Sequence, residues 1–231
     1  LGLKFPKCEI QCLTASLELA DANFTAQPAG FICESVLSAG GIIVPPEGYL
    51  NRVKAECDKR GMELIMDEAQ TGLGKTGKLF GFQHEPGLKP GIIALSKHFG
   101  GGLPISAVCT TADVAKRAVG RGYFATRSHA TDPLLCAAGE ESLDIVVEED
   151  MPGKAAQIER WIKSAFRKMA KEFEWIGDIR GRGVLLGIEL VADRQTKAPA
   201  NAETQKIYDY ALDKGLIFQI RGGRELKNVI R

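Results

Sequence analysis

The chain has 231 residues, of which 45% are hydrophobic and 26% are charged, and its formal net charge is +1. This length suits one large domain or two modest ones, and the composition is that of an ordinary globular protein. The near-zero charge argues against a global field that attracts nucleic acid or an anionic membrane. No apolar run approaches the ~18 residues that a membrane-spanning helix needs.

Strands and helices alternate through the first part of the chain. The apolar periods and turn residues predict helices at 16–27, 47–60 and 113–119, and strands at 31–34, 63–66, 92–95 and 105–110. In the helix at 47–60, Leu50, Val53 and Cys57 form one apolar stripe, and Gly61 follows where a left-handed cap belongs. This order of elements predicts an α/β fold with a mostly parallel sheet.

After residue 133 the pattern changes to a partial α+β segment. It predicts two long helices at 134–149 and 154–173, a strand within 179–191, a helix at 203–214 and a strand at 216–220. Trp161, Ala165 and Met169 give the second long helix its apolar face. We therefore predict a large domain over residues 1–149 and a smaller C-terminal domain over residues 150–231, both partial.

The six cysteines lie mostly in apolar runs, and no secretory signal opens the chain. We expect reduced core thiols and a cytoplasmic protein, with organellar targeting left open. Neither the cysteines nor the three histidines show metal-ligand spacing, so we predict no metal site. Because the chain does not begin with Met and opens with a pattern from the middle of a domain, we expect a fragment of a longer protein.

A glycine-rich stretch, "GLGKTGK" at 72–78, resembles a phosphate-binding loop. Lys78, however, is followed by Leu79, whereas a Walker A loop needs a hydroxyl there to hold magnesium. Asp67 and Glu68 stand at the end of the preceding strand and would repel a phosphate group. A nucleotide-binding protein therefore stays only as a remote alternative.

A different pair of residues suggests another chemistry. Asp67 follows the strand "LIM" and Lys97 follows "IIALS", so both lie at carboxyl ends of predicted strands. Ligands of doubly wound sheets bind at that edge. A lysine there can form an imine with an aldehyde, and a carboxylate can keep a pyridine nitrogen protonated. Together they match what a protein supplies to pyridoxal phosphate.

Each of these two residues also has a simpler interpretation. A lysine after a strand is typical of a solvated loop, and an aspartate at a strand end is typical of a turn cap. Only the pair in its local context favours the cofactor.

Five stretches extend this argument over nearly the whole chain. In chain order they are "FICESVLSAGG", "LIMDEAQTGLGKTGKLFGF", "ALSKHFGGGLPISAV", "SHATDP" and "IGDIRGRGVLLGIEL". Together they resemble the class III aminotransferases, which are pyridoxal phosphate enzymes of fold type I. Within that family the chain is most similar to the 2,2-dialkylglycine decarboxylases. The D-E-x-Q-T-G and S-K-x-x-G-x-G-x-P blocks carry most of the resemblance.

The resemblance implies five cofactor contacts. Lys97 matches the lysine that holds the cofactor aldehyde and moves a proton, and Asp67 matches the partner of the ring nitrogen. Ala69 matches a small residue against one ring face, and Gln70 matches the amide near the ring hydroxyl. Ser128 stands where the family usually has a threonine that binds the cofactor phosphate of the neighbouring subunit.

The resemblance also implies residues on the substrate side and a partner. Glu34 matches an acidic residue near the substrate, and Arg231 matches the arginine that holds the substrate carboxylate. Asp132 matches an aspartate that helps to bind an alkali ion in the decarboxylase, although a helix cap explains it equally well. The implied substrates are an amino acid and a 2-oxo acid, and the implied assembly is a homodimer with shared active sites.

Several functions remain open at this point. The first is decarboxylation-dependent transamination of a 2,2-dialkylglycine, and an ordinary ω-aminotransferase is its alternative within the family. A nucleotide-binding protein built on "GLGKTGK" is the remote alternative. A non-catalytic partner subunit is another, because the family's cofactor-phosphate loop and ring-stacking aromatic residue do not occur in this sequence.

Overall fold

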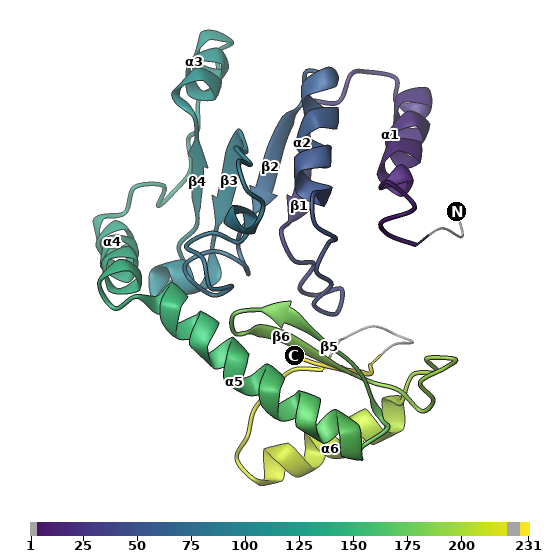
Figure 1. Cartoon of the computed structure of the whole chain (residues 1–231). Coiled ribbons are helices and arrows are strands. Elements are labelled where there is room, and N and C mark those ends of the chain that lie inside the picture. The colour runs from purple at the N-terminus through teal and green to yellow at the C-terminus, as the bar shows by residue number, and fades with distance from the viewer. Residues whose placement is uncertain (1–3, 221–226) are drawn as a thin grey trace. The chain divides into compact units, whose positions relative to one another are not determined.

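The computed structural model describes residues 4–220 and 227–231, which form two compact units that each contain one sheet (Figure 1). The first unit comprises Leu1–Ser35, Pro45–Gln70 and Phe82–Ile145, and the second comprises Val36–Val44, Thr71–Gly81 and Val146–Arg231. The C-terminal unit therefore includes two segments from the first half of the chain. The predicted division at residue 149 stays a prediction.

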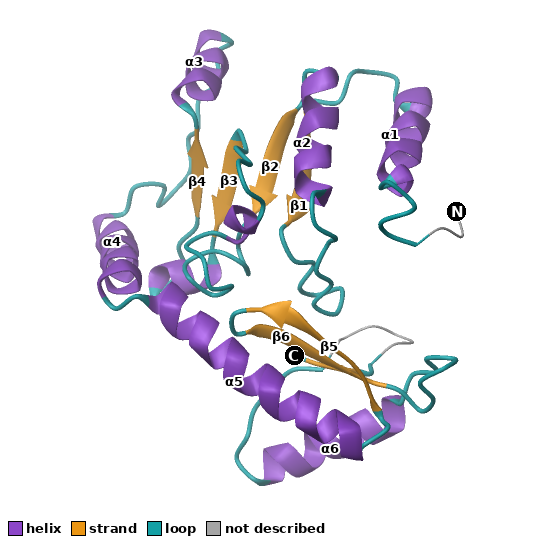
Figure 2. Cartoon of the chain, in the orientation of Figure 1, coloured by secondary structure: helices purple, strands orange, loops and turns teal. Residues whose placement is uncertain are grey.

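The sheet of the first unit has the strand order β1-β2-β3-β4 (Figure 2). Strands β1 (Gly30–Glu34), β2 (Glu63–Asp67) and β3 (Ile92–Leu95) are parallel, as predicted. Strand β4 (Ala107–Thr110) runs antiparallel to β3. The connection at 96–106 holds only a short 3-10 helix, and a parallel crossover of a dozen or more residues usually carries an α-helix. The chain therefore returns along β3.

Helices α1 (Gln11–Asn23) and α2 (Tyr49–Lys59) pack on one face of this sheet. Leu64 and Met66 of β2 point into that core and are fully buried, as the period-2 pattern of a strand requires. The predicted stripe of α2 is buried in the same core. Gly61 has φ of 65°, which confirms the left-handed cap.

Two short 3-10 helices and two α-helices complete this part of the chain. They are the 3-10 helices η1 (Gly81–His84) and η2 (Lys97–Gly100) and the helices α3 (Ala112–Gly120) and α4 (Pro133–Glu148). Thr111 begins α3 by accepting a hydrogen bond from the Val114 amide. Helices α3 and α4 lie within one residue of the boundaries predicted at 113–119 and 134–149.

The second unit consists of an antiparallel sheet with two helices. Its elements are α5 (Met151–Glu172), β5 (Ile176–Arg182), β6 (Leu185–Leu190), α6 (Asn201–Asp213) and β7 (Val229–Ile230), and its strand order is β5-β6-β7. Ile176, Ile188 and Leu190 form its core, against which Phe166 and Ala170 of α5 pack.

Some sequence predictions for these elements are wrong. The strand predicted within 179–191 is β6, and Gly183, with φ of 58°, provides the glycine turn before it. Strand β5, which pairs with β6 across this turn, is absent from the sequence prediction. Within the described residues 216–220 there is only an isolated bridge from Ile220 to Ile230. Helix α1 begins five residues before the prediction at Ser16, whose hydroxyl bonds the Cys12 carbonyl inside the helix.

The predicted burial of two other sets of residues is also wrong. Trp161 of α5 is 64% exposed. The residues of α5 that pack against the core are Phe166 and Ala170 instead. All six cysteines are free thiols, but only Cys57 is fully buried, and Cys12, Cys109 and Cys136 are exposed. Among the helices of the described residues, none combines the length and apolar character of a membrane span.

Candidate active site

Residues from three strands form one row at the carboxyl edge of the first sheet. Glu34 and Asp67, the last residues of β1 and β2, pair in register, and Asp67 in turn pairs with Ala94 of β3. Lys97 lies two residues after the end of β3 and begins η2. Register partners project to the same face of a sheet. The structure thus places Glu34 and Asp67 together, with Lys97 at the end of the neighbouring strand.

Asp67 and Lys97 each have a polar atom that the described residues leave without a partner. Asp67 is half-buried, and its Oδ1 accepts a hydrogen bond of 3.0 Å from the Ala69 amide. Within residues 4–220 and 227–231, its Oδ2 and the exposed Nζ of Lys97 have no hydrogen-bond or ion-pair partner. A carboxylate oxygen and an amine at one sheet edge are thus available to a ligand.

Lys97 itself has an unusual backbone conformation. Its φ is 58°, in the left-handed region that a non-glycine residue adopts at a cost of about 1–3 kcal/mol. Such strain persists where the surroundings hold it and is concentrated at functional sites. Lys97 lines a hollow of about 300 Å³ together with Ser96 and residues 103–106.

The turn that carries Lys97 is anchored by its own apolar residue. Phe99, two positions on, is buried. Its ring lies 3.1 Å from where a Cβ on Gly139 of α4 would stand, and Ile105 lies 3.2 Å from the same point. A glycine at 139 therefore allows α4 to approach the turn closely, which keeps Lys97 in place.

Glu68 is a supporting residue that the sequence analysis did not identify. It is 1% exposed, its Oε1 accepts a hydrogen bond of 2.8 Å from the Phe82 amide, and its own amide donates to the Ala94 carbonyl. It therefore fixes the segment after β2. Strand alternation contains the signal, because Glu68 follows Leu64 and Met66 on the core-facing positions.

The pKa of the Cys33 thiol is raised by its surroundings at this edge. Burial, together with the neighbouring Cys57, Glu68, Asp67 and Glu34, raises the pKa of Cys33 to about 11. Because a thiolate is the reactive form, this cysteine is an inert thiol at neutral pH.

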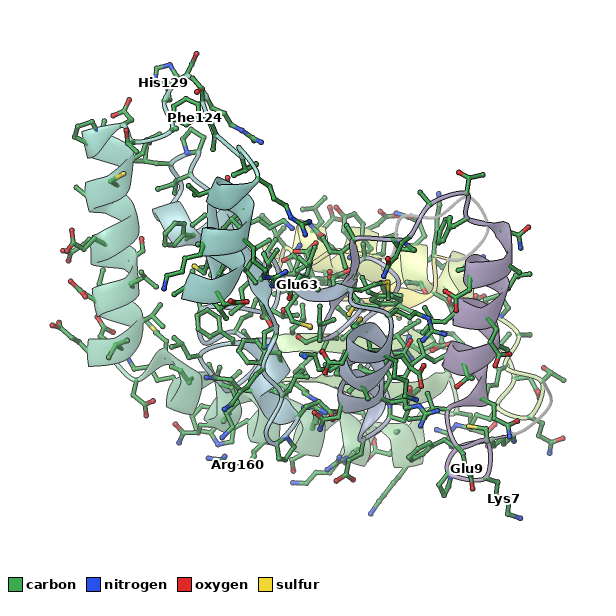
Figure 3. All side chains as sticks on the ribbon, turned by 90° about the horizontal axis from the view of Figure 1, so that it is seen from above. Lys7, Glu9, Glu63, Phe124, His129 and Arg160 are labelled. Carbon is green, nitrogen blue, oxygen red and sulfur yellow. The ribbon has the colours of Figure 1, made fainter. Side chains whose placement is uncertain are left out.

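The predicted phosphate contact lies in an exposed stretch. Ser128 belongs to residues 121–130, all of which are exposed, and Phe124 and His129 project outward from this stretch (Figure 3). Asp132 accepts a hydrogen bond of 3.2 Å from the Leu134 amide and so begins α4. The helix-cap interpretation of Asp132 is thus confirmed. The described residues contain no cluster of three His, Cys, Asp or Glu side chains that fits a metal ion.

Arg231 belongs to the second unit, whereas Asp67 and Lys97 belong to the first. Its Nη1 donates to the Ser38 carbonyl at 3.4 Å and its Nη2 to the Gln219 side chain at 3.1 Å. Its role in substrate binding stays a prediction.

The glycine-rich turn at 71–81 has a structural explanation. Gly74 and Gly77 have φ near 88°. A Cβ on Gly74 would lie 3.1 Å from the backbone of Pro152, and one on Gly77 would lie 3.3 Å from Ala156, both on α5. Turns and the short η1 follow, instead of the α-helix whose N-terminus would face a phosphate group. The glycines therefore permit close packing within the second unit.

Comparison with known proteins now identifies the family. Residues 3–231 match the family described as "Aminotransferase class-III". The chain belongs to the class III aminotransferases. It is 35% identical to a leucine/methionine racemase of Thermococcus litoralis over 98% of its own length and 51% of the relative.

Solved structures of transaminases have the same fold. A Bacillus anthracis aminotransferase matches with a TM-score of 0.89 and 30% identity, over 96% of this chain and 51% of that one. An amine transaminase from an uncultivated Pseudomonas species, solved with pyridoxal phosphate bound, matches with a TM-score of 0.82 and 30% identity, over 96% and 50%. The fold is thus fold type I. The chain spans about half the length of the proteins that it matches.

The residues of the first sheet fit the cofactor of this family. Pyridoxal phosphate needs an amine for its aldehyde and a carboxylate for its ring nitrogen. Lys97 and Asp67 provide these two groups from adjacent strands, and neither group forms an ion pair with another described side chain. Ala69 is small enough to leave space beside a ring.

Proposed function

We propose that the chain forms part of a pyridoxal phosphate enzyme that transfers amino groups between amino acids and 2-oxo acids. The observation that carries this proposal is the uncommitted pair of Asp67 and Lys97 at the carboxyl ends of β2 and β3. Membership of the class III aminotransferases supports it.

Each residue of the site has a defined task in this proposal. Bound pyridoxal phosphate supplies an aldehyde for the substrate amine and a ring that withdraws electrons from the substrate α-carbon. The Lys97 amine holds the cofactor and then carries a proton to and from that carbon. The Asp67 carboxylate accepts a hydrogen bond from the ring nitrogen and keeps it protonated. Ala69 and Gln70 contact the ring face and its hydroxyl.

The substrate class follows from the similarity of the motifs. We assign decarboxylation-dependent transamination of a 2,2-dialkylglycine, with Glu34 on the substrate side and Arg231 holding the carboxylate. An ω-aminotransferase is the second candidate, and the several transaminases among the matching structures favour it. The two reactions differ in which bond at the α-carbon breaks.

The proposed assembly is a homodimer with shared active sites. Ser128 lies in the exposed stretch at 121–130, where a hydroxyl is accessible to a neighbouring subunit. In that arrangement Ser128 binds the cofactor phosphate of the partner's site. The large and small domains of this proposal comprise residues 1–149 and 150–231.

Borohydride reduction tests the cofactor site directly. The purified protein is incubated with pyridoxal phosphate, reduced with borohydride, digested and mapped by mass spectrometry. We expect the pyridoxyl group on Lys97. A pyridoxyl group found only on other lysines, such as the exposed Lys78, would contradict the proposal.

The choice of substrate has its own experiment. The protein with cofactor is offered 2-aminoisobutyrate and pyruvate, and both carbon dioxide and alanine are measured. Equal amounts of the two products support the decarboxylase. Amino transfer from a primary amine or an ω-amino acid, without carbon dioxide, assigns the ω-aminotransferase instead.

A further inference from the structure

A tight turn at residues 37–43 of the second unit has a strained backbone. Its two ends pair as an antiparallel bridge, and the Ser38 carbonyl accepts hydrogen bonds from the Gly41 and Ile42 amides. Ile42 has φ of 56°, which makes it a genuine outlier for a β-branched residue. Such strain persists only where the surrounding structure holds it, and it is concentrated at ligand-binding segments. The contacts around this turn therefore hold it in one conformation.

Ile42 anchors the turn to the antiparallel sheet. Its side chain is fully buried and packs with Val36 and Leu185. A Cβ on Gly187 of β6 would lie 2.9 Å from the Ile42 Cβ, and a Cβ on Gly181 of β5 would lie 3.1 Å from its Cγ2. Glycine at these two positions lets the turn approach the sheet closely. Apolar packing thus fixes the middle of the turn.

Arg180 of β5 provides a polar contact to the same turn. Its Nε donates a hydrogen bond of 2.9 Å to the Gly41 carbonyl. Its Nη1 pairs with Asp178 at 2.9 Å and also with Glu189. These two carboxylates orient the planar guanidinium, whose donors form a rigid fork. The Arg180 side chain is 19% exposed, so its bond to the turn is largely shielded from water.

The turn contacts Arg231 through the Ser38 carbonyl. Nη1 of Arg231 donates to this oxygen at 3.4 Å, and Nη2 donates to the Gln219 side chain at 3.1 Å. A guanidinium has five N–H donors, and the part of the chain that the structure describes accepts from only these two nitrogens. The Nε is buried and has no partner there. Arg231 therefore keeps donors for a carboxylate.

We propose that Arg180 is a positioning residue for the substrate carboxylate. Gly41 accepts from Arg180 through its carbonyl and donates to the Ser38 carbonyl through its amide. The Ser38 carbonyl in turn contacts Arg231. Because a guanidinium binds a carboxylate through two parallel hydrogen bonds, its direction sets the affinity. The ligand class is a 2-oxo acid or an amino acid, and the inference rests on the role that we propose for Arg231 and deepens it.

Steady-state kinetics of Arg180→Leu, with pyruvate as the 2-oxo acid, test this inference. We expect KM for pyruvate to rise by about tenfold or more and kcat to stay within about threefold, since the loss concerns binding and not the bond that breaks. The dissociation constant of pyridoxal phosphate should stay within about threefold. Calorimetric titration with pyruvate, which needs no turnover, should show the same weakening. Unchanged affinity for pyruvate overturns the inference.

Arg194→Leu is the matched control in the same unit. Arg194 also donates to backbone carbonyls, those of Ala170, Phe173 and Glu174, and its hydrogen bonds within the described residues do not involve the turn at 37–43. We expect it to lose stability while KM for pyruvate stays within about twofold. Equal increases of KM in the two leucine variants would mean that lost stability alone raises it, which overturns the inference.

Arg180→Lys separates the ion pairs from the contact with the turn. Lysine keeps a cation beside Asp178 and Glu189, but one ammonium group cannot reproduce the fork that also reaches the Gly41 carbonyl. We expect KM for pyruvate to rise by about fivefold or more. A KM equal to that of the unchanged protein overturns the inference, because the ion pairs alone then suffice. If Arg180→Leu does not fold, this variant decides.

Arg231→Leu distinguishes a failure of this inference from a failure of the proposed function. We expect it to raise KM for pyruvate at least as much as Arg180→Leu does. An increase in Arg231→Leu but not in Arg180→Leu overturns the inference and leaves the proposed function standing. No increase in either variant overturns the proposed role of Arg231 as well. Borohydride labelling of Lys97 in both variants checks that the cofactor site is intact.

Discussion

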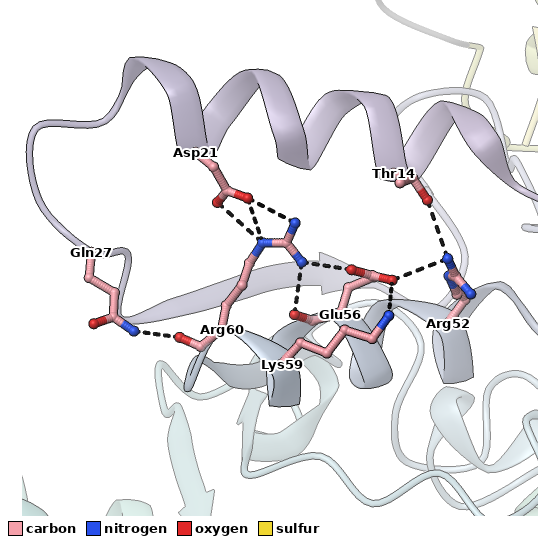
Figure 4. A network of polar contacts seen from close by, with 7 residues as sticks. All are labelled: Thr14, Asp21, Gln27, Arg52, Glu56, Lys59 and Arg60. Carbon is pink, nitrogen blue, oxygen red and sulfur yellow. Dashed lines mark hydrogen bonds and ion pairs between the residues drawn. The ribbon is translucent and has the colours of Figure 1, made fainter.

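Two carboxylates in the same unit, Glu56 and Asp67, differ in how many ion-pair partners the protein gives them. Glu56 of α2 is 4% exposed and lies within ion-pair distance of Arg60 at 2.7 Å, Lys59 at 2.9 Å and Arg52 at 3.2 Å (Figure 4). Asp67 of β2 is half-buried and has a single hydrogen bond, from the backbone two residues on.

The difference between these carboxylates separates structural from chemical roles. Arg60 also pairs with Asp21 of α1 at 2.8 Å, so the Glu56 network fastens α1 to α2. All charges in it are satisfied by the protein itself. At the carboxyl edge of the sheet, Asp67 and Lys97 keep their charges available to a ligand. Substitutions at the two places should therefore have different consequences, namely lost stability at Glu56 and lost chemistry at Asp67 and Lys97.

The largest effect is expected for Lys97→Ala. It removes the amine that we propose to hold the cofactor and move the proton, so we expect amino transfer to fall by about 10²–10⁴-fold. Steady-state assays with a matched amino donor and 2-oxo acid measure the loss. Lys78→Ala is the control, because Lys78 is an exposed lysine of the glycine-rich turn, and its activity should stay within about twofold. Equal losses in both variants would contradict the assignment of Lys97.

The next effect is expected for Asp67→Asn. A hydrogen bond to a charged group contributes about 1.5–3 kcal/mol, so cofactor binding should weaken by about 10- to 100-fold. Titration of the protein with pyridoxal phosphate, followed by its visible absorbance, gives the dissociation constant. Asp58→Asn removes an exposed carboxylate that pairs only with Lys54 among the described residues, and it should leave cofactor binding unchanged.

Most strands and helices of the first unit follow from local sequence patterns. The alternation at Leu64 and Met66 and the stripe on α2 each specify one buried face, and the structure buries both. The errors arise where a residue has two local roles. Ser16 resembles a helix N-cap, but its hydroxyl bonds to the Cys12 carbonyl in the helix interior. Strand β5 contains the glycines and charged residues of the predicted glycine turns, and only its pairing with β6 shows that it is a strand.

The positions of Asp67 and Lys97 in the fold were predictable from the sequence, whereas the contacts that support them were not. Strand ends in a parallel sheet share an edge, so the proximity of Asp67 and Lys97 follows from two predicted strands. The close approach of Gly139 to Phe99, in contrast, joins residues forty positions apart and has no local signature. The same holds for Gly74 against Pro152, which turned an apparent phosphate loop into a packing contact.

The Glu56 network should respond in stability and not in chemistry. Glu56→Gln removes the charge that three cations share, and we expect the free energy of unfolding to fall by about 1–3 kcal/mol. Urea unfolding at pH 7 measures this loss. Cofactor binding, measured on the same variant, should stay within about threefold, which is the opposite result from Asp67→Asn. A variant that loses cofactor affinity without losing stability would remove the distinction between the two carboxylates.

The same network predicts a pH dependence with a definite sign. Hydrogen bonds from Lys59 and Arg60 lower the pKa of Glu56 from 4.5 to about 2. Since the folded pKa is the lower one, the stabilisation is fully present above about pH 4.5 and is lost as the pH falls toward 2. Unfolding midpoints at pH 6 and pH 3 should therefore differ more for the unchanged protein than for Glu56→Gln. Parallel declines in both proteins would contradict this assignment.

The smallest effect is expected for Asp113→Asn. This substitution tests whether burial, or only the presence of an arginine partner, makes a carboxylate stabilise the fold. Asp113 lies 3.0 Å from the Arg117 guanidinium, but its side chain is 80% exposed, whereas that of Glu56 is 5% exposed. Water and salt screen an exposed pair, so the free energy of unfolding should fall by at most about 0.5 kcal/mol. Urea unfolding in low salt and in 1 M salt measures the change, which should vanish in high salt, where the Debye length is about 3 Å. A loss as large as that of Glu56→Gln would mean that pairing with arginine, and not exclusion from water, sets the stabilisation at Glu56.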